Sequence, residues 1–301
     1  MAFSVSVDRI DETGRELLSY GTEDFPIAFF DDDLTIVSVP YHWHDEFEIV
    51  IITEGSIRVR IAGEEFTLSA GDGYFTNKGI LHASTLKTST GHQHALVFSP
   101  GVVSQSGDLI WKTYVSPILE NRRFPFLRLS ASVSWQREIL QLAEAAWRSG
   151  GYETEDYPIV VRSSLSRAFS LLMRHINDPE NAFRYSGRLQ RDEERIKKAL
   201  VFIEKNFDGS VTIENIAESA SVSTSTCLRL FGNVLGTTPI AFLVEYRLRR
   251  AVEELKHADG RTISEIAYSC GFSDASYFNR CFRKEYGITP TEYISKHLAN
   301  K

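Results

Sequence analysis

The last third of the chain repeats itself with a period of about 51 residues. Four landmarks of one segment return in the same order in the next. They are Phe231, Gly236, Pro239 and Phe242 in the first copy and Phe282, Gly287, Pro290 and Tyr293 in the second. A period of this size, with glycines at helix ends and prolines at helix starts, indicates a duplicated helical unit.

Each copy predicts two helices joined by a tight turn. The predicted helices are 213–220, 224–235, 263–270 and 274–286. Thr212 and Thr262 are suited to cap the first helix of each pair, and Ser273 the second helix of the second pair. This arrangement is a helix-turn-helix, whose second helix enters the DNA major groove.

A continuous helix is predicted over 239–256, between the two copies. At 1.5 Å per residue it spans roughly 27 Å. A spacer of that length can hold two recognition helices about one DNA turn, ~34 Å, apart. One chain is therefore expected to contact two adjacent segments of major groove.

Residues 266–290 read IAYSCGFSDASYFNRCFRKEYGITP, which resembles the signature of the AraC-type transcription regulators. The resemblance covers about the last 105 residues. It implies a seven-helix DNA-binding domain with two helix-turn-helix motifs. Cys227 departs from the pattern, because the family usually has a larger apolar residue there and the second copy has Phe278. We therefore expect the second motif to be better packed.

The helical spacing predicts which side chains face DNA. The predicted contacts are Thr224, Ser225, Leu228 and Arg229 in the first copy and Ala275, Ser276, Asn279 and Arg280 in the second. Arg229 and Arg280 suit guanine or phosphate, and Asn279 suits adenine. Alternatively, either arginine only pairs with a nearby acid. Three further arginines are expected to face phosphate or solvent: Arg247, Arg249 and Arg250.

The region from about residue 26 to residue 100 predicts short strands. The segments 34–39, 47–52 and 56–61 are rich in β-branched residues and are separated or followed by glycines such as Gly55 and Gly63. Short strands this close together indicate a sandwich or barrel.

Two motifs in this region resemble those of cupins. His42, His44, Glu48 and Gly55 match H-x-H-x3-E-x6-G, and Gly73, Gly79 and His82 match the second motif, which has Asn77 in place of its proline. In metal-binding cupins the matching three histidines and one glutamate hold a divalent transition metal, for which imidazole and carboxylate are suitable ligands.

We favour the alternative that these side chains line a ligand pocket, so no cofactor is expected. The predicted ligand-binding set is His42, Trp43, His44, Glu48, Tyr74 and His82. If a metal is bound, its ligands would be His42, His44, Glu48 and His82. Such groups suit a hydroxyl-rich molecule, and a sugar is the common case in the family. His92 and His94 form a second pair, which we expect at the surface.

Helical periodicity returns after the barrel, and helices are predicted within about 108–177, including 135–148 and 158–176. The resemblance implies that this region forms a homodimer. The polar segment 181–190 is the predicted linker. The chain is thus divided into a sensing and dimerisation domain, 1–180, and a DNA-binding domain, 191–301.

The two halves differ in charge. Residues 188–301 hold 17 Lys and Arg against 15 Asp and Glu, a net charge of +2, whereas residues 1–187 hold 16 against 25, a net charge of −9. The overall charge of −7 therefore does not exclude a nucleic-acid partner. Three cysteines without C-x-x-C spacing, and no apolar run of about 20 residues, favour a cytoplasmic protein.

The predicted fold is a multidomain α and β protein. It has an N-terminal cupin-like β-barrel with appended helices and a C-terminal all-α domain with two helix-turn-helix motifs. The predicted function is a ligand-responsive, sequence-specific transcription regulator of carbohydrate-related genes, and not an enzyme. Its expected partners are promoter DNA, a small effector, a second copy of the chain and, as a further candidate, RNA polymerase, but no membrane. The alternative is a metal-dependent cupin enzyme with a DNA-binding tail.

Overall fold

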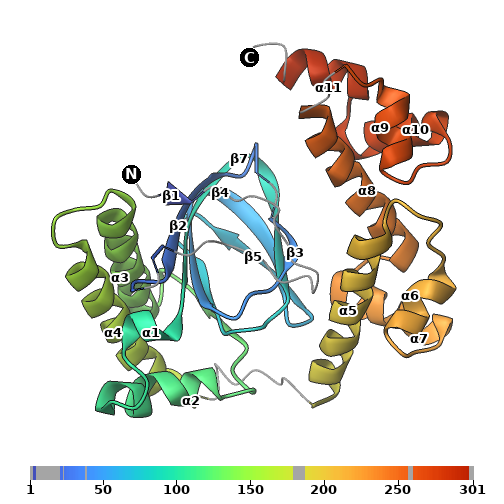
Figure 1. Ribbon diagram of the computed structural model, residues 1–301. Coiled ribbons are helices and arrows are strands. Elements are labelled where there is room, and N and C mark those ends of the chain that lie inside the picture. Colours follow the sequence, from blue (N-terminus) through green and yellow to red (C-terminus); the bar gives the residue numbers. More distant parts are fainter. Residues whose placement is uncertain are drawn as a thin grey trace. The chain divides into compact units, whose positions relative to one another are not determined.

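The computed structural model describes residues 3–4, 21–22, 24–37, 39–178, 187–256 and 260–297. The chain divides into two units, Met1–Glu193 and Glu194–Lys301. The first unit contains a curled β-sheet with helices on its outer side, and the second is helical (Figure 1). This arrangement confirms the predicted fold class.

Over the described residues, the sheet of the first unit has eight strands. They are β1 (Phe3–Ser4), β2 (Ile27–Asp33), β3 (Val39–His42), β4 (Phe47–Ile61), β5 (Glu64–Ser69), β6 (Gly73–Thr76), β7 (His82–Phe98) and β8 (Phe126–Leu129). The order along the sheet is β1-β2-β7-β4-β6-β8, while β3 pairs with β7 and β5 pairs with β4. β4 and β7 are long and pair along most of their length, so they form the spine of the sheet.

Predicted segments 47–52 and 56–61 are one strand, β4, rather than two. Gly55 does not end the strand but lies in an irregular stretch where the pairing with β7 changes register, with a φ of +72°. Such a bulge bends a strand without breaking it. The bend lets β4 curl around an interior whose apolar side chains include Val50, Ile52 and Val59.

The outer face of the sheet carries the appended helices. They are α1 (Pro100–Val103), the π-helical turn η1 (Trp111–Val115), α2 (Ser116–Leu119), α3 (Ser134–Gly151) and α4 (Tyr157–His175). The predicted helices 135–148 and 158–176 are therefore confirmed as α3 and α4. Gly150 lets α3 approach the sheet closely, since a Cβ there would lie 2.0 Å from the ring of Phe29. Beside it, Nε1 of Trp147 donates to the carbonyl of Phe30 at 2.7 Å.

Predicted strand 34–39 is wrong for residues 34–37, which form a turn, whereas Val39 begins β3 and Ser38 lies outside the described residues. The Asp33 carboxylate accepts hydrogen bonds from the amide (2.9 Å) and hydroxyl (2.6 Å) of Thr35, and its carbonyl accepts from Ile36 and Val37. These bonds close a turn directly after β2, and an Asp side chain favours such turns. β8 lies beyond the region of about 26–100 that was predicted to form strands. Because β8 pairs with β6, the sheet extends to Leu129 and not only to residue 100.

The second unit consists of helices. They are the greater part of α5 (Gly187–Asn206), followed by α6 (Ile213–Ser219), α7 (Thr224–Leu230), the π-helical segment η3 (Phe231–Leu235), α8 (Pro239–Lys256), α9 (Ile263–Ser269), α10 (Ala275–Tyr286) and α11 (Pro290–His297). Thr212 and Thr262 form capping boxes with the residues three positions later, as their placement predicts. Gly236 and Gly287 end their helices with left-handed φ angles of 66° and 76°. The cap of α10, however, is Asp274 and not Ser273, because its carboxylate accepts from the amide of Tyr277.

The two helix-turn-helix motifs differ at two places. The second helix of the first motif changes from α-helix to π-helix at Phe231, whereas α10 is α-helical throughout. The first turn also places Ser221 at a φ of +54°, where the second has Gly271 at +82°. A left-handed conformation is costly for residues with a Cβ. The first motif therefore carries backbone strain that the second avoids.

The predicted linker, 181–190, extends too far. Residues 187–190 form the first turn of α5, and Arg188 pairs with Asp192 one turn later (Nε–Oδ2 3.8 Å). Residues 181–186 lie outside the described part of the chain. Within the described ranges no single helix is long and apolar enough to cross a membrane. One bent pair, Thr224–Leu235 with Pro239–Lys256, passes that test by length and composition.

Candidate functional site

Three histidines and one glutamate meet inside the first unit. His42 ends β3, His82 begins β7, Glu48 lies on β4, and His44 lies in the connection between β3 and β4. All four are buried, with exposed fractions between 0% and 9%. His42 and His44 have the spacing of residues on one face of a strand, but they do not share one because β3 ends at His42. They come together because His42 pairs with His82 and the amide of Gly79 donates to the carbonyl of His44 at 2.7 Å.

The imidazoles are close enough to share one ion. One ring nitrogen from each of His42, His44 and His82 can be chosen so that all lie within 4.8 Å of one another. Each Nδ1 faces a main-chain carbonyl, at 2.8 Å for His42, 3.1 Å for His44 and 2.8 Å for His82. A hydrogen bond to a carbonyl requires a hydrogen on Nδ1 and so fixes the tautomer.

Glu48 is the charged group of this cluster. Its Oε2 lies 2.9 Å from Nε2 of His82 and 3.7 Å from Nε2 of His44. Burial alone would raise the pKa of Glu48, but the neighbouring His82 and His44 outweigh it and hold that pKa well below its ordinary value. Despite the short distances, Oε2 and both Nε2 atoms lack a hydrogen bond of acceptable geometry.

Other polar side chains line the same interior. Thr76 pairs with Glu48 across β6 and β4, and its hydroxyl is buried without a hydrogen-bond partner. Oε1 of Gln93 is also unpartnered, while its Nε2 donates to Asp32 at 3.1 Å. Tyr74 is buried on the inner face, where burial and the charges of Glu48 and Asp32 raise its pKa. The interior thus contains several polar atoms that a bound molecule or ion could satisfy.

Predicted ligand residue Trp43 is half-buried between His42 and His44. Tyr74 lies near the cluster, with its ring centroid 6.4 Å from that of His82. The structure thus brings together His42, His44, Glu48 and His82 and places Tyr74 beside them.

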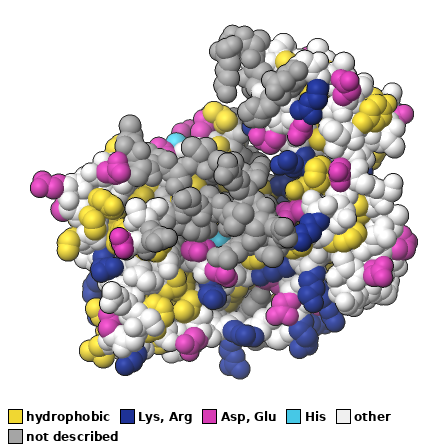
Figure 2. All heavy atoms as spheres, viewed as in Figure 1, with side chains coloured by type: hydrophobic (Ala, Val, Ile, Leu, Met, Phe, Trp, Pro, Cys, Tyr) yellow, Lys and Arg dark blue, Asp and Glu magenta, His cyan; other side chains and the backbone are white. Residues whose placement is uncertain are grey.

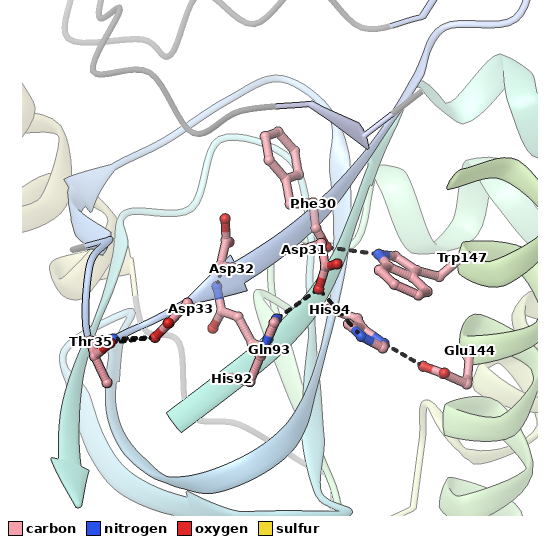
Figure 3. A network of polar contacts seen from close by, with 10 residues as sticks. All are labelled: Phe30, Asp31, Asp32, Asp33, Thr35, His92, Gln93, His94, Glu144 and Trp147. Atoms are coloured by element: carbon pink, nitrogen blue, oxygen red, sulfur yellow. Dashed lines mark hydrogen bonds and ion pairs between the residues drawn. The ribbon is translucent and has the colours of Figure 1, made fainter. Parts of the chain in front are cut away.

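A second polar network lies on the outer face of the sheet (Figure 3). Nδ1 of His94 contacts Glu144 of α3 at 2.7 Å, and Nε2 of His92 contacts Asp31 of β2 at 2.7 Å. The ring of His94 stacks on Trp147, with centroids 3.4 Å apart. His94 is therefore largely covered, at 13% side-chain exposure, and the expectation of a surface residue holds only for His92. This network fastens α3 to the sheet.

In the first motif, α7 exposes Ser225, Leu228 and Arg229, while Thr224 is half-buried. Its opposite face is anchored by Cys227, at 1% exposure. Cys227 thus fills the anchor position with a smaller side chain than Phe278 does in the second motif.

In the second motif, α10 exposes Ser276, Asn279 and Arg280, and Ala275 is half-buried. The sequence reading missed Tyr277, which is 42% exposed on the same helix. The guanidinium of Arg280 lies 5.9 Å from the centroid of that ring.

Within the described residues, neither Arg229 nor Arg280 forms an ion pair with an acid. The alternative that they serve only as ion-pair partners therefore finds no support. Figure 2 shows acidic and basic side chains interspersed on the visible face, without one large patch of either sign.

Arg247 has a structural role instead of facing phosphate. Its Nε donates to the carbonyl of Phe207 and its second guanidinium nitrogen to that of Gly209, each at 2.7 Å. Burial lowers the pKa of Arg247, which is consistent with a partly covered position. The guanidinium fastens the segment after α5 to α8.

Two family models match the chain, and they coincide with the two sites just described. An AraC-like ligand binding domain matches residues 26–112, and a helix-turn-helix domain matches residues 216–296. The first contains the histidine cluster and the second contains both recognition helices. The chain is an AraC-type transcription regulator.

This AraC-type regulator is similar to other regulators along most of its length. It is 28% identical to the uncharacterized HTH-type transcriptional regulator YdeC of Bacillus subtilis, over 94% of this chain and 97% of YdeC. It is 28% identical to the HTH-type transcriptional activator RhaS of Salmonella schwarzengrund, over 89% of this chain and 91% of RhaS. A solved structure of ToxT from Vibrio cholerae with a bound unsaturated fatty acid covers 90% of this chain and 94% of ToxT, at 16% identity and a TM-score of 0.42.

Three residues of this AraC-type regulator that bear on its sites were missed from the sequence. Tyr277 lies three residues after Asp274, the cap of α10. Its place in the first turn of the helix could have been predicted only from that cap and not from Ser273. Thr76 and Gln93 belong to no sequence motif. Only the register of β6 and β7 against β4 shows that their side chains face the interior.

Proposed function

We propose that this AraC-type regulator reads DNA through the exposed faces of α7 and α10, under the control of an effector bound in the curled sheet. The observation that supports it is the position of Arg229 and Arg280. Each lies on the exposed face of a recognition helix whose opposite face is anchored in the core. A guanidinium free of acidic partners can clamp phosphate or read guanine.

The test of DNA contact uses the full chain and a DNA site that the chain itself has selected from a pool of random sequences. Arg229→Ala and Arg280→Ala are expected to weaken binding by about 1–3 kcal/mol, or roughly 5- to 150-fold, if each reads a base. If an arginine contacts phosphate instead, binding should fall evenly across sequences and the salt dependence should flatten. Fluorescence anisotropy at several salt concentrations measures both.

Lys256→Ala is the matched control, because this cation already pairs with Glu253 at 2.7 Å. It removes the same charge from the same unit and should leave affinity within about twofold, as expected for a weak surface pair. The assignment is wrong if Arg229→Ala and Arg280→Ala both bind the site as tightly as the unchanged protein.

The proposed effector site is the polar interior around His44, Glu48, Thr76 and His82. Buried polar atoms without hydrogen bonds are costly, and a bound polar molecule would satisfy them. A sugar is our first candidate, consistent with the resemblance, and carbohydrate-related genes are the corresponding proposed targets. A ligand that binds only the folded state raises the unfolding temperature, so a thermal-shift screen of sugars is the test. A screen in which no sugar shifts that temperature would contradict this choice.

Other parts of the proposal concern assembly and location. We also propose a homodimer through the α3–α4 region, a cytoplasmic location and contact with RNA polymerase. Sedimentation of the full chain tests whether it forms a dimer. In a dimer, effector binding could change which DNA half-sites are reached together, provided the effector binds the two states with different affinity.

The alternative function is a metal-dependent cupin enzyme with a DNA-binding tail. The cluster of His42, His44, His82 and Glu48 is the feature that favours it. The relatives YdeC and RhaS are named as transcriptional regulators, which supports regulation without catalysis. Substrate turnover by the purified chain, lost in His44→Ala, would reverse that preference.

A further inference from the structure

The two recognition helices place chemically different side chains at one equivalent position. α7 begins at Thr224, and α10 begins at Ala275, which lies 51 residues later. The same offset relates Leu228 to Asn279, so each is the fifth residue of its helix. The first motif therefore has an apolar side chain where the second has an amide.

The buried faces of the two helices show that these positions have the same orientation. The residues directly before them, Cys227 and Phe278, are 1% and 0% exposed and anchor their helices in the core. The arginine of each recognition helix follows directly after them and is exposed. Leu228 itself is 44% exposed, and Asn279 is exposed as well. Both side chains are therefore directed away from the core, on the face proposed to meet DNA.

The exposed faces also differ in charge one turn further along each helix. In the first motif the next two exposed residues are Gly232 and Asn233, whereas in the second they are Arg283 and Lys284. Cations of this kind contact phosphate and carry no sequence information by themselves. The second helix thus has additional groups for the DNA backbone, while the first presents an apolar side chain beside a single arginine.

An apolar side chain in the major groove has one specific target among the base edges. The C5 methyl group of thymine is the only methyl group that the standard base pairs present there, whereas asparagine reads N6 and N7 of adenine. Leucine has no hydrogen-bonding atom, so the polar edges of other bases would lose water against it without a replacement. Single exposed leucines are common on protein surfaces, and what distinguishes Leu228 is its position within a recognition helix, next to an exposed arginine.

We propose that Leu228 selects thymine through its C5 methyl group, so that the first motif reads a thymine where the second reads an adenine through Asn279. This inference rests on the proposed function, because it requires α7 and α10 to enter the major groove. The two groove segments contacted by one chain then differ in sequence. The DNA site is asymmetric for a single chain and gives that chain a defined orientation.

The test removes one methyl group from the DNA and leaves every base pair intact. In a site that the full chain has selected from random sequences, each thymine is replaced in turn by deoxyuridine, which pairs as thymine does but lacks the methyl group. We expect one such replacement to weaken binding about fourfold, the factor that corresponds to ~0.8 kcal/mol for one buried carbon. The Leu228→Ala chain should bind the thymine and deoxyuridine forms of that site with the same affinity.

Asn279→Ala is the matched control, because it truncates the equivalent side chain of the second motif. It should weaken binding to the selected site and keep the fourfold effect of the deoxyuridine replacement. Leu228→Asn gives a second comparison, since a new selection with this variant should change the preferred base at that position from thymine to adenine. Leu228 is exposed, so its replacement should leave the fold intact, and thermal unfolding of each variant verifies this.

Two outcomes overturn the proposal while DNA binding itself stands. In the first, no deoxyuridine replacement weakens binding of the unchanged chain. In the second, the effect of the replacement persists in Leu228→Ala, so that another residue contacts the methyl group. Arg229→Ala and Arg280→Ala test the proposed function separately. If both of these variants bind the selected site normally, the proposed function has failed and the role of Leu228 fails with it.

Discussion

Asn77 offers a sharp test of how the loop before β7 is held. Its side chain is buried and makes three hydrogen bonds. Nδ2 donates to the carbonyls of Ile118 (2.7 Å) and Phe124 (3.1 Å), and Oδ1 accepts from the amide of Lys78 (2.8 Å). The amide of Asn77 also donates to the carbonyl of Pro125 at 2.8 Å, a bond that proline in this position could not form. The departure from the cupin motif therefore has a structural reason.

Replacing Asn77 by alanine removes all three side-chain bonds and leaves two carbonyls without this donor. At about 1 kcal/mol for each bond, the free energy of unfolding should fall by roughly 3 kcal/mol. For a unit of this size, that corresponds to a decrease of roughly 6–12 °C in unfolding temperature. Asn77→Asp should be still less stable, because its carboxylate would face two carbonyl oxygens in a buried position.

Tryptophan fluorescence is a selective probe for this experiment, because all four tryptophans precede residue 194 and report on the first unit. Thermal unfolding of the full chain should show an earlier fluorescence transition in both Asn77 variants. Asn121→Ala, which loses one exposed bond to the amide of Arg123, is the control and should change stability by less than about 1 kcal/mol. A loss below 1 kcal/mol in Asn77→Ala, or an Asn77→Asp variant as stable as the unchanged protein, would refute the reasoning.

The second unit gives two further predictions. Ser221→Gly should stabilise the first motif by about 0.5–1 kcal/mol, because relief of the left-handed conformation exceeds the added entropy of the unfolded chain. Denaturant unfolding measures this change. Ser273→Gly, at a position without a positive φ, is the control and is expected to destabilise the protein. Glu265 accepts from the amide of Thr262 at 2.7 Å, and hydrogen bonds from that amide and hydroxyl lower its pKa below the ordinary 4.5. A lowered folded pKa gives stability above pH 4.5 that is lost as the pH falls through the folded value, so the advantage of the unchanged protein over Glu265→Gln should shrink from pH 6 to pH 3. An advantage that does not change with pH would contradict this origin.

The helical half of the protein was accessible from the sequence because its signals are local. Caps such as Thr212 and Thr262, and C-terminal glycines such as Gly236 and Gly287, act within one turn of a helix. The π-helical segment after Leu230 was not foreseen, because it does not change the pattern of buried residues. Arg247 was misplaced because its partners are main-chain carbonyls some 40 residues earlier, which no residue pattern identifies.

The sheet was less accessible because its bounds depend on pairing between distant segments. Gly55 looks like a strand end, yet β7 pairs on both sides of it and makes it a bulge. Residues 34–37 have the composition of a strand, but the local bonds of Asp33 close a turn there. β8 has only four residues, and its assignment rests on its pairing with β6. In each case a tertiary or side-chain contact overrides propensity.

The two His-x-His pairs show why spacing alone does not define a site. His92 and His94 lie within β7, so alternation places both on the outer face and directs Gln93 inward. There they meet Asp31 and Glu144 and fasten α3 to the sheet.

His42 and His44 have the same spacing, but alternation does not apply to them because β3 ends at His42. The chain turns, and a hydrogen bond between the amide of Gly79 and the carbonyl of His44 fixes the second imidazole against His82. Position in the strand thus separates a structural network from a candidate metal centre. It follows that shifting His42 and His44 by one residue along the chain would abolish the cluster. Replacing His92 by a residue of similar size would leave the cluster intact.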